Sequence, residues 1–288
     1  MSSFLKSIFI AAFPVFALVV LIDTVWFILQ SGITILNVAH FMTAASIVFF
    51  FGSLFIRPLA RTDSVLIPYT FCVFLGCMMS LIVGNLQEDI HFRFFGLLGN
   101  ILLTACWVLY LLWYSYFQKR DAESNTILKV GNCLPLLRFE DAEKVTVTSE
   151  KFAGTPSIFI FYRGNWCPFC MAQIKEMVSK HEELTDRNIN TVFISSQPHG
   201  FSENLTKKYP LDFQFLVDVN GEVAQQLNIF HSYGLPFGFQ LFGFKSHTSL
   251  PTIIITDAEE KIIYTNQTDN YRERPEPKTL LRIIDANV

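Results

Sequence analysis

The sequence predicts two parts of different kinds: an α-helical transmembrane bundle of about four helices, followed by an α/β domain. Charged residues make up only 16% of the chain, well below the quarter that is typical of soluble domains. They are scarce between Ile8 and Phe117 and become ordinary in frequency from Gln118 onward. We therefore expect a membrane domain at 1–117, a linker at 118–130 and a soluble domain at 131–288, which is long enough to bury its own core.

Four apolar stretches reach the length of about 20 residues that a bilayer-spanning helix needs. The first is too long for a cleaved signal peptide and lacks a convincing cleavage site, so we expect it to be retained as a helix. A tight turn at Ser31-Gly32 separates it from the second. The predicted spans are Ile8–Gln30, Ile33–Ile56, Val65–Gly84 and Phe95–Phe117.

Basic residues near the ends of the spans predict the orientation. With four spans, the N-terminus, the second loop and the soluble domain share one side of the membrane, and that side holds Lys6, Arg57, Arg61, Lys119 and Arg120. The other side holds Arg93, accompanied by Glu88 and Asp89. The positive-inside rule then predicts a multi-pass protein of the cell (inner) membrane whose soluble domain is cytoplasmic.

Two ionisable residues fall inside the predicted spans. Asp23 lies eight residues before Ser31 and His40 eight residues after Gly32, which places both at about 12 Å from the turn. Pairing across the hairpin would lower the cost of burying them in lipid. The pair is interpreted either as a proton or quinone site or as a structural polar contact.

The soluble half alternates strands and helices and closes with a late hairpin. This order is typical of an α/β domain of the thioredoxin type. The predicted strands are Ser157–Tyr162, Thr191–Ser195, Phe215–Val217, Thr252–Thr256 and Lys261–Thr265, and the predicted helices are Met171–Thr185, Glu203–Lys208, Glu222–Leu227 and Pro277–Asp285.

A Cys-x-x-Cys pair lies where the first of these strands meets its helix. Cys167 is expected just before the helix, with Pro168 in the first turn, where a missing N–H has no cost. The helix N-terminus favours a thiolate, and Arg163 would add positive charge if it points inward. Cys167 is therefore expected to have a lowered pKa and to act as nucleophile, and Cys170 to resolve the mixed disulfide. Trp166 adjoins the pair.

Pro251 and Thr252 supply the expected second half of this site. A proline directly before a strand is where the thioredoxin fold holds a cis peptide bond beside the cysteines. The exposed backbone at Pro251 would then dock an extended substrate segment.

From Gly131 to Val288 the chain resembles the peroxiredoxin-like branch of the alkyl hydroperoxide reductase and thiol-specific antioxidant family. The resemblance rests on the decapeptide Phe161–Cys170, on Ile194-Ser195, on Leu250-Pro251-Thr252, and on Tyr271 with Arg274-Pro275. It does not extend to the membrane half, which resembles the fused relatives of vitamin K epoxide reductase in architecture only. Peroxiredoxins place threonine or serine three residues before the peroxide-reacting cysteine and proline seven before it. Counted from Cys170, Cys167 and Arg163 occupy those places.

The first functional hypothesis is a membrane-anchored thiol–disulfide oxidoreductase that uses Cys167, Cys170 and Pro251. The resemblance implies an alternative, a thiol peroxidase that reduces hydroperoxides, and a redox-responsive membrane regulator or electron conduit is a third. Expected partners are a dithiol donor of thioredoxin or glutathione type, a disulfide or hydroperoxide substrate, and the lipid bilayer. A net charge of −3 without a basic stripe argues against nucleic acid, and we expect neither a metal nor a cofactor.

Several residues carry weaker predictions. Cys133 is either a further resolving thiol or incidental. Tyr271, Arg272 and Arg274 either shape an anionic or peroxide pocket or, as we expect, are exposed charge on a loop. The segment Phe230–Phe244 is either a lid, a docking surface or an ordinary long loop.

Overall fold

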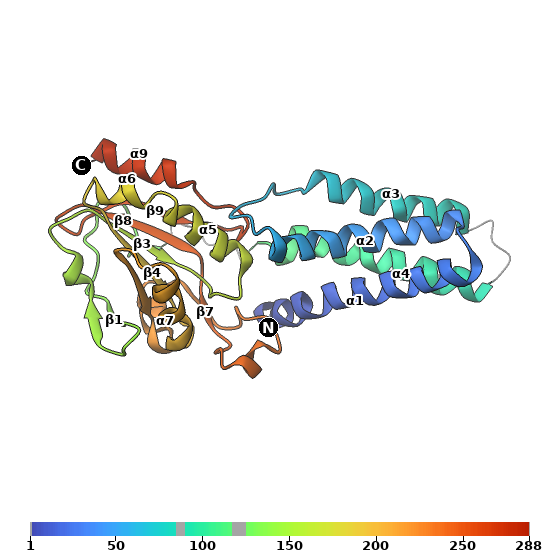
Figure 1. The fold of residues 1–288 in the computed structure, drawn as a ribbon, viewed down its shortest axis with the longest axis horizontal. Helices are drawn as coiled ribbons and strands as arrows, with labels where there is room; N and C mark the ends of the chain where they lie inside the picture. The colour runs from blue at the N-terminus through green and yellow to red at the C-terminus, as the bar shows by residue number, and fades with distance from the viewer. Residues whose placement is uncertain (1, 85–89, 117–124, 288) are drawn as a thin grey trace. The chain divides into compact units, whose positions relative to one another are not determined.

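The structure is a computed structural model that describes residues 2–84, 90–116 and 125–287 (Figure 1). The chain divides into two compact units. One comprises residues 8–58 and 62–116, and the other comprises residues 1–7, 59–61 and 117–288. We call them the helical unit and the α/β unit.

The helical unit is built from four long helices, and the last of them continues into one π-helical turn at Tyr110–Tyr114. Three helical segments are long and apolar enough to cross a membrane: Ser3–Ser31, Ile35–Ile56 and Gly96–Tyr114. The fourth apolar helix, Ile67–Val83, is shorter. The bounds are α1 Ser2–Ser31, α2 Ile35–Ile56, α3 Ile67–Gly84 and α4 Ile90–Leu109.

Close packing and polar contacts join these helices. A Cβ atom added to Gly76 of α3 would lie 2.7 Å from the carbonyl oxygen of Ala39 in α2, so glycine permits the close approach of the two backbones. The Trp107 indole Nε1 donates to the Thr70 hydroxyl at 3.0 Å and links α4 to α3. Many large apolar side chains of this unit are exposed; that of Leu29, for example, is 77% exposed. Such a surface suits lipid better than water.

The α/β unit contains a seven-stranded mixed sheet of order β2-β1-β5-β4-β3-β8-β9. The central strands β3, β4 and β5 are parallel, while β8 runs antiparallel to β3 and β9 runs antiparallel to β8. A separate small ribbon pairs β6 with β7. The bounds are β1 Arg138–Glu140, β2 Thr146–Thr148, β3 Ser157–Phe161, β4 Asn190–Ser195, β5 Phe213–Val217, β6 Phe230–His231, β7 Thr248–Ser249, β8 Thr252–Thr256 and β9 Ile262–Gln267.

Helices cover this sheet, and Figure 1 shows α5, α6 and α9 gathered along one side of it. Every residue of β3 and of β8 is buried, as expected of strands covered on both faces. The helices are α5 Pro168–Val178, α6 His181–Thr185, α7 His199–Lys208, α8 Glu222–Gln226 and α9 Pro277–Asn287, with short 3-10 helices at Ser149–Phe152, Val219–Gly221 and Phe239–Phe242.

Two predictions differ from the structure in the α/β unit. The helix expected over Met171–Thr185 is two helices, because the chain leaves the helical conformation at Lys180. The short strands β1 and β2 were not expected, since each is only three residues long. Part of the predicted linker, and the residues Glu88, Asp89, Lys119 and Arg120 used for the orientation, lie outside the described residues.

Candidate functional site

The two cysteines lie at the N-terminus of α5, directly after the loop that follows β3. Cys167 is the N-cap residue, Pro168 is the first helical residue and Cys170 lies in the first turn. Both side chains are buried, with 2% of Cys167 and 0% of Cys170 exposed. Both are free thiols. The motif residues therefore occupy the strand-to-helix junction that the sequence predicts.

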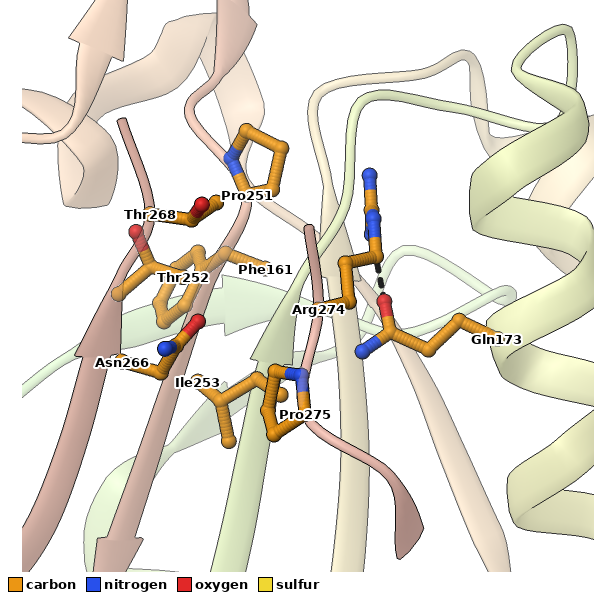
Figure 2. A pocket seen from close by; sticks show the side chains of 9 residues that line it. All are labelled: Phe161, Gln173, Pro251, Thr252, Ile253, Asn266, Thr268, Arg274 and Pro275. Atoms are coloured by element: carbon orange, nitrogen blue, oxygen red, sulfur yellow. Dashed lines mark hydrogen bonds between the residues drawn. The ribbon is translucent and has the colours of Figure 1, made fainter. Parts of the chain in front are cut away.

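Arg274 contacts Cys170. This guanidinium comes from the segment between β9 and α9, and its Nη2 donates to the Cys170 Sγ at 3.5 Å. Its Nη1 donates to the Gln173 Oε1, and its Nε donates to the Tyr271 carbonyl oxygen at 3.3 Å. Figure 2 shows Gln173 on α5 reaching the guanidinium. The hydrogen bonds to Gln173 and to the Tyr271 carbonyl thus hold the charge beside the sulfur.

The expected exposure of this segment is wrong. Tyr271, Arg272 and Arg274 are 5%, 0% and 8% exposed. Tyr271 packs edge-on against Phe169 of α5, with ring centroids 5.3 Å apart. Charged residues spaced along an irregular segment suggested a solvated loop, but the contact with α5 is a tertiary feature that local sequence does not encode.

The expected pKa of Cys167 is also wrong, because burial and the neighbouring Cys170 raise it well above the ordinary value. The lowered pKa belongs to Cys170. Burial opposes ionisation of Cys170, but the hydrogen bond from Cys167, the charge of Arg274 and the backbone N–H of Arg163 outweigh it and lower the pKa to about 5. The helix N-terminus is close to both sulfurs, whereas the hydrogen bond from Cys167 and the direct contact with Arg274 favour the thiolate of Cys170.

Arg163 points inward, as the sequence analysis required for it to act on the cysteines. Its side chain is 6% exposed, its guanidinium lies 4.7 Å from the Trp166 ring centroid, and it donates to the Gly234 carbonyl oxygen. Its charge favours the thiolate forms of Cys167 and Cys170. Arg163 therefore adds a second cation to the site.

A polar framework holds the loop before Cys167 in place. The Gln197 Oε1 accepts from the backbone N–H of Asn165 at 2.9 Å, and the Gln197 Nε2 donates to the Tyr162 hydroxyl at 3.0 Å. Gly164 has φ +145°, and a Cβ added there would lie 2.6 Å from the Trp166 Nε1. Gln197 and Gln173 were not predicted as site residues; the spacing of Gln173, one turn after Cys170, is the only sequence signal for either.

Pro251 and Thr252 line a small hollow together with Gln173 and Arg274 (Figure 2). Its volume that is accessible to water-sized molecules is about 10 Å³, which is roughly enough for one water molecule. The expected cis peptide bond before Pro251 is wrong, since the chain has none among its described residues. Pro251 therefore borders the hollow beside Arg274 and follows a trans peptide bond.

Other predicted residues lie apart from this arrangement. Cys133 is exposed, and its backbone forms an isolated antiparallel β-bridge with that of Lys261. In Phe230–Phe244, Phe239 contacts the Trp166 ring, with centroids 6.0 Å apart, while Leu241 is 89% exposed. Asp23 and His40, in the helical unit, line one cavity.

Comparison with known proteins gives a consistent match for the α/β unit. Residues 130–265 match the family model described as the AhpC/TSA family. The chain is 25% identical over 167 residues to the chloroplastic peroxiredoxin Q of Populus jackii, a match that covers 56% of this chain and 72% of that protein. It is 25% identical over 158 residues to the chloroplastic peroxiredoxin Q of Sedum lineare, covering 54% and 78%. Among solved structures, peroxidoxin BcpB from Mycobacterium tuberculosis aligns with a TM-score of 0.47 and 18% identity, over 55% of this chain and 97% of that one.

Proposed function

We propose that this chain, whose residues 130–265 form a peroxiredoxin-like domain of the AhpC/TSA family, is a membrane-anchored thiol peroxidase. Cys170 is the peroxide-reacting nucleophile and Cys167 is the resolving thiol. The observation that carries this proposal is the contact between the Arg274 Nη2 and the Cys170 Sγ at 3.5 Å. It reverses the roles that the sequence analysis gave to the two cysteines.

The chemistry follows from which sulfur is ionised. The thiolate is the nucleophilic form of cysteine, and with a pKa of about 5 Cys170 is ionised at neutral pH. Its sulfur attacks the terminal oxygen of a hydroperoxide, the O–O bond breaks, and Cys170 becomes a sulfenic acid. The leaving alkoxide or hydroxide develops negative charge, and the cations Arg274 and Arg163 stabilise that charge.

Cys167 suits the second half of the reaction because it keeps its proton. Its raised pKa leaves it a neutral thiol that donates its proton to the leaving alkoxide. The Cys167 thiolate formed in this way attacks the Cys170 sulfenic acid and releases hydroxide, which completes the disulfide. One hydroperoxide and the dithiol thus yield one alcohol, one water and the disulfide, with protons balanced by solvent.

A dithiol of thioredoxin or glutathione type then reduces the disulfide by thiol–disulfide exchange. The apolar helices anchor the enzyme in the cell (inner) membrane, with the α/β unit in the cytoplasm. The similarity to proteins named peroxiredoxin Q supports a hydroperoxide as substrate. Pro251 and Thr252 border the hollow beside Arg274 and are proposed to contact the substrate.

Disulfide exchange as the main activity has less support. That hypothesis needs Cys167 as the attacking thiolate, whereas the pKa of Cys167 is raised. No observation specifically favours the regulator or electron conduit.

The test compares two reactions of the full-length chain in nanodiscs. We expect hydrogen peroxide or cumene hydroperoxide to be consumed with dithiothreitol as reductant, and reduction of insulin disulfides to be slower by at least about tenfold. Cys170→Ser should abolish peroxide consumption, and Cys133→Ser is the matched control that leaves it unchanged. Rapid insulin reduction with negligible peroxide consumption would contradict the proposal.

A further inference from the structure

The helical unit contains a cavity, lined by both polar and apolar residues, that the proposed peroxidase reaction does not use. Its volume that is accessible to water-sized molecules is about 140 Å³, and α1, α2 and α4 each contribute to its wall. The lining residues are Val20, Asp23, Thr24, Phe27, Asn37, His40, Gly96 and Gly99.

Three of its polar residues are buried, which is unusual within helices apolar enough to cross a membrane. Thr24, Asn37 and His40 are 4%, 2% and 6% exposed. Polar side chains at such positions are costly in lipid and are retained mostly where they serve a site. The cavity therefore calls for an occupant with polar groups.

The unsatisfied acceptor oxygen of Asn37 indicates which polar group the occupant carries. The Asn37 Nδ2 donates to the Gly32 carbonyl oxygen at 3.3 Å, while its buried Oδ1 has no hydrogen-bond partner among the residues that the structure describes. Asp23 adds a carboxylate, which accepts hydrogen bonds when ionised. Two side chains thus offer acceptors, so the occupant must supply donors, and hydroxyl groups are the donors that a lipid-soluble molecule carries.

The remaining wall suits an aromatic ring. Phe27 supplies an aromatic face, Val20 an aliphatic one, and Gly96 and Gly99 leave room on α4. His40 packs close to Gly96, since a Cβ added there would lie 2.4 Å from the imidazole ring. An added Cβ at Gly99 meets nothing within 4 Å, so the free space lies at Gly99. A cavity of about 150 Å³ is known to hold one benzene ring.

We infer that this cavity binds the hydroxylated aromatic ring of a membrane-dissolved molecule, either a hydroquinone or a phenol. The ring lies between Phe27 and Gly99, and its hydroxyl groups donate to the Asn37 Oδ1 and the Asp23 carboxylate. This inference rests on the helical unit alone and holds whether or not Cys170 reduces peroxides.

Isothermal titration of the full-length chain in nanodiscs, under anaerobic conditions, tests the inference with three matched probes. Duroquinol carries two hydroxyl groups, tetramethylphenol carries one, and durene has the same methylated ring without any. We expect saturable binding of a hydroxylated probe, with durene at least tenfold weaker because it cannot donate to Asn37. Tighter binding of duroquinol than of tetramethylphenol assigns the site to a hydroquinone, and equal binding assigns it to a phenol.

Two substitutions locate the binding. Gly99→Leu should fill the cavity and weaken binding at least tenfold, while Gly52→Leu is its matched control, because Gly52 also has open space around it but does not line the cavity. Asn37→Leu should weaken the binding of duroquinol and leave the binding of durene unchanged. This variant provides the test if Gly99→Leu does not fold. Equal binding of duroquinol and durene, or unchanged binding in the folded variants, would overturn the inference.

Discussion

At the scale of single residues, two cysteines three positions apart differ in pKa because Cys170 accepts a hydrogen bond from Cys167 and lies against the Arg274 guanidinium. Arg274 lies 3.5 Å from the Cys170 Sγ, and in a buried site such a charge acts with little screening. The pKa of Cys170 falls while that of Cys167 rises. A residue 104 positions away in the chain thus helps to determine which sulfur is ionised.

Arg274→Met should raise the pKa of Cys170 above its value of about 5. Only the thiolate reacts with peroxide, so the wild-type rate should be constant at neutral pH and fall as the pH drops through about 5. In the variant the fall should begin at a higher pH, and the plateau should be lower by about 10²-fold because a transition-state donor is lost. Stopped-flow oxidation by hydrogen peroxide between pH 4 and 8 measures both the pH at which the rate falls and the plateau rate.

Arg282→Met is the control for that experiment, because Arg282 is exposed on α9 and, within the described part of the chain, donates hydrogen bonds to Lys278 and Thr279 of its own helix. Its pH profile should match that of the wild type. If Arg274→Met gives the same midpoint as wild type, the role assigned to Arg274 is wrong.

At the scale of elements, the loop between β3 and α5 depends on one glycine. Gly164 has φ +145° and leaves no room for a side chain beside Trp166. Its neighbour Asn165 is held through the Gln197 Oε1. A strained loop at this position would displace the helix N-terminus that carries both cysteines.

Gly164→Ala is therefore expected to lower the free energy of unfolding of the α/β unit by about 1–3 kcal/mol, through backbone strain and the clash with the indole. Thermal unfolding of the full-length chain in detergent measures this as a drop of several degrees. Gly200→Ala, in α7 with open space around it, is the matched control and should be neutral or slightly stabilising. A Gly164→Ala midpoint equal to that of Gly200→Ala would contradict the account.

The sequence predicted the elements that have strong local patterns. The continuous apolar runs of β3, β4 and β8, and the Cys-x-x-Cys at a helix start, appear where expected because burial and helix capping act locally. It did not predict β1 and β2, which pair with each other, or the pairing of β1 with β5. Nor did it predict the contacts of Arg274 and Gln173, since a contact across 101 residues leaves no local signal.

At the scale of the whole molecule, the chain joins a thiol site to helices with an apolar surface. Three of the four predicted spans satisfy the length and hydropathy that a membrane crossing requires. The orientation stays a prediction, since several of the charges on which it rests lie outside the described residues.

Labelling of Cys133 tests that orientation. Cys133 is exposed, whereas Cys167 and Cys170 are buried. A membrane-impermeant maleimide should label Cys133 in inverted inner-membrane vesicles and not in intact spheroplasts, because the α/β unit is expected in the cytoplasm. Cys133→Ser should remove the signal. Labelling confined to spheroplasts would place the unit on the opposite side.

The proposed reaction begins at the Cys170 sulfur, which reacts with peroxide. The direct measurement treats the full-length Cys167→Ser chain in nanodiscs with one equivalent of hydrogen peroxide in the presence of dimedone, followed by peptide mass spectrometry. Removing the resolving thiol should let the sulfenic acid persist, so the account predicts a dimedone adduct on Cys170. The parallel Cys170→Ser chain should give no adduct on Cys167. An adduct on Cys167 in that chain, with Cys170 unmodified in the other, would contradict the account.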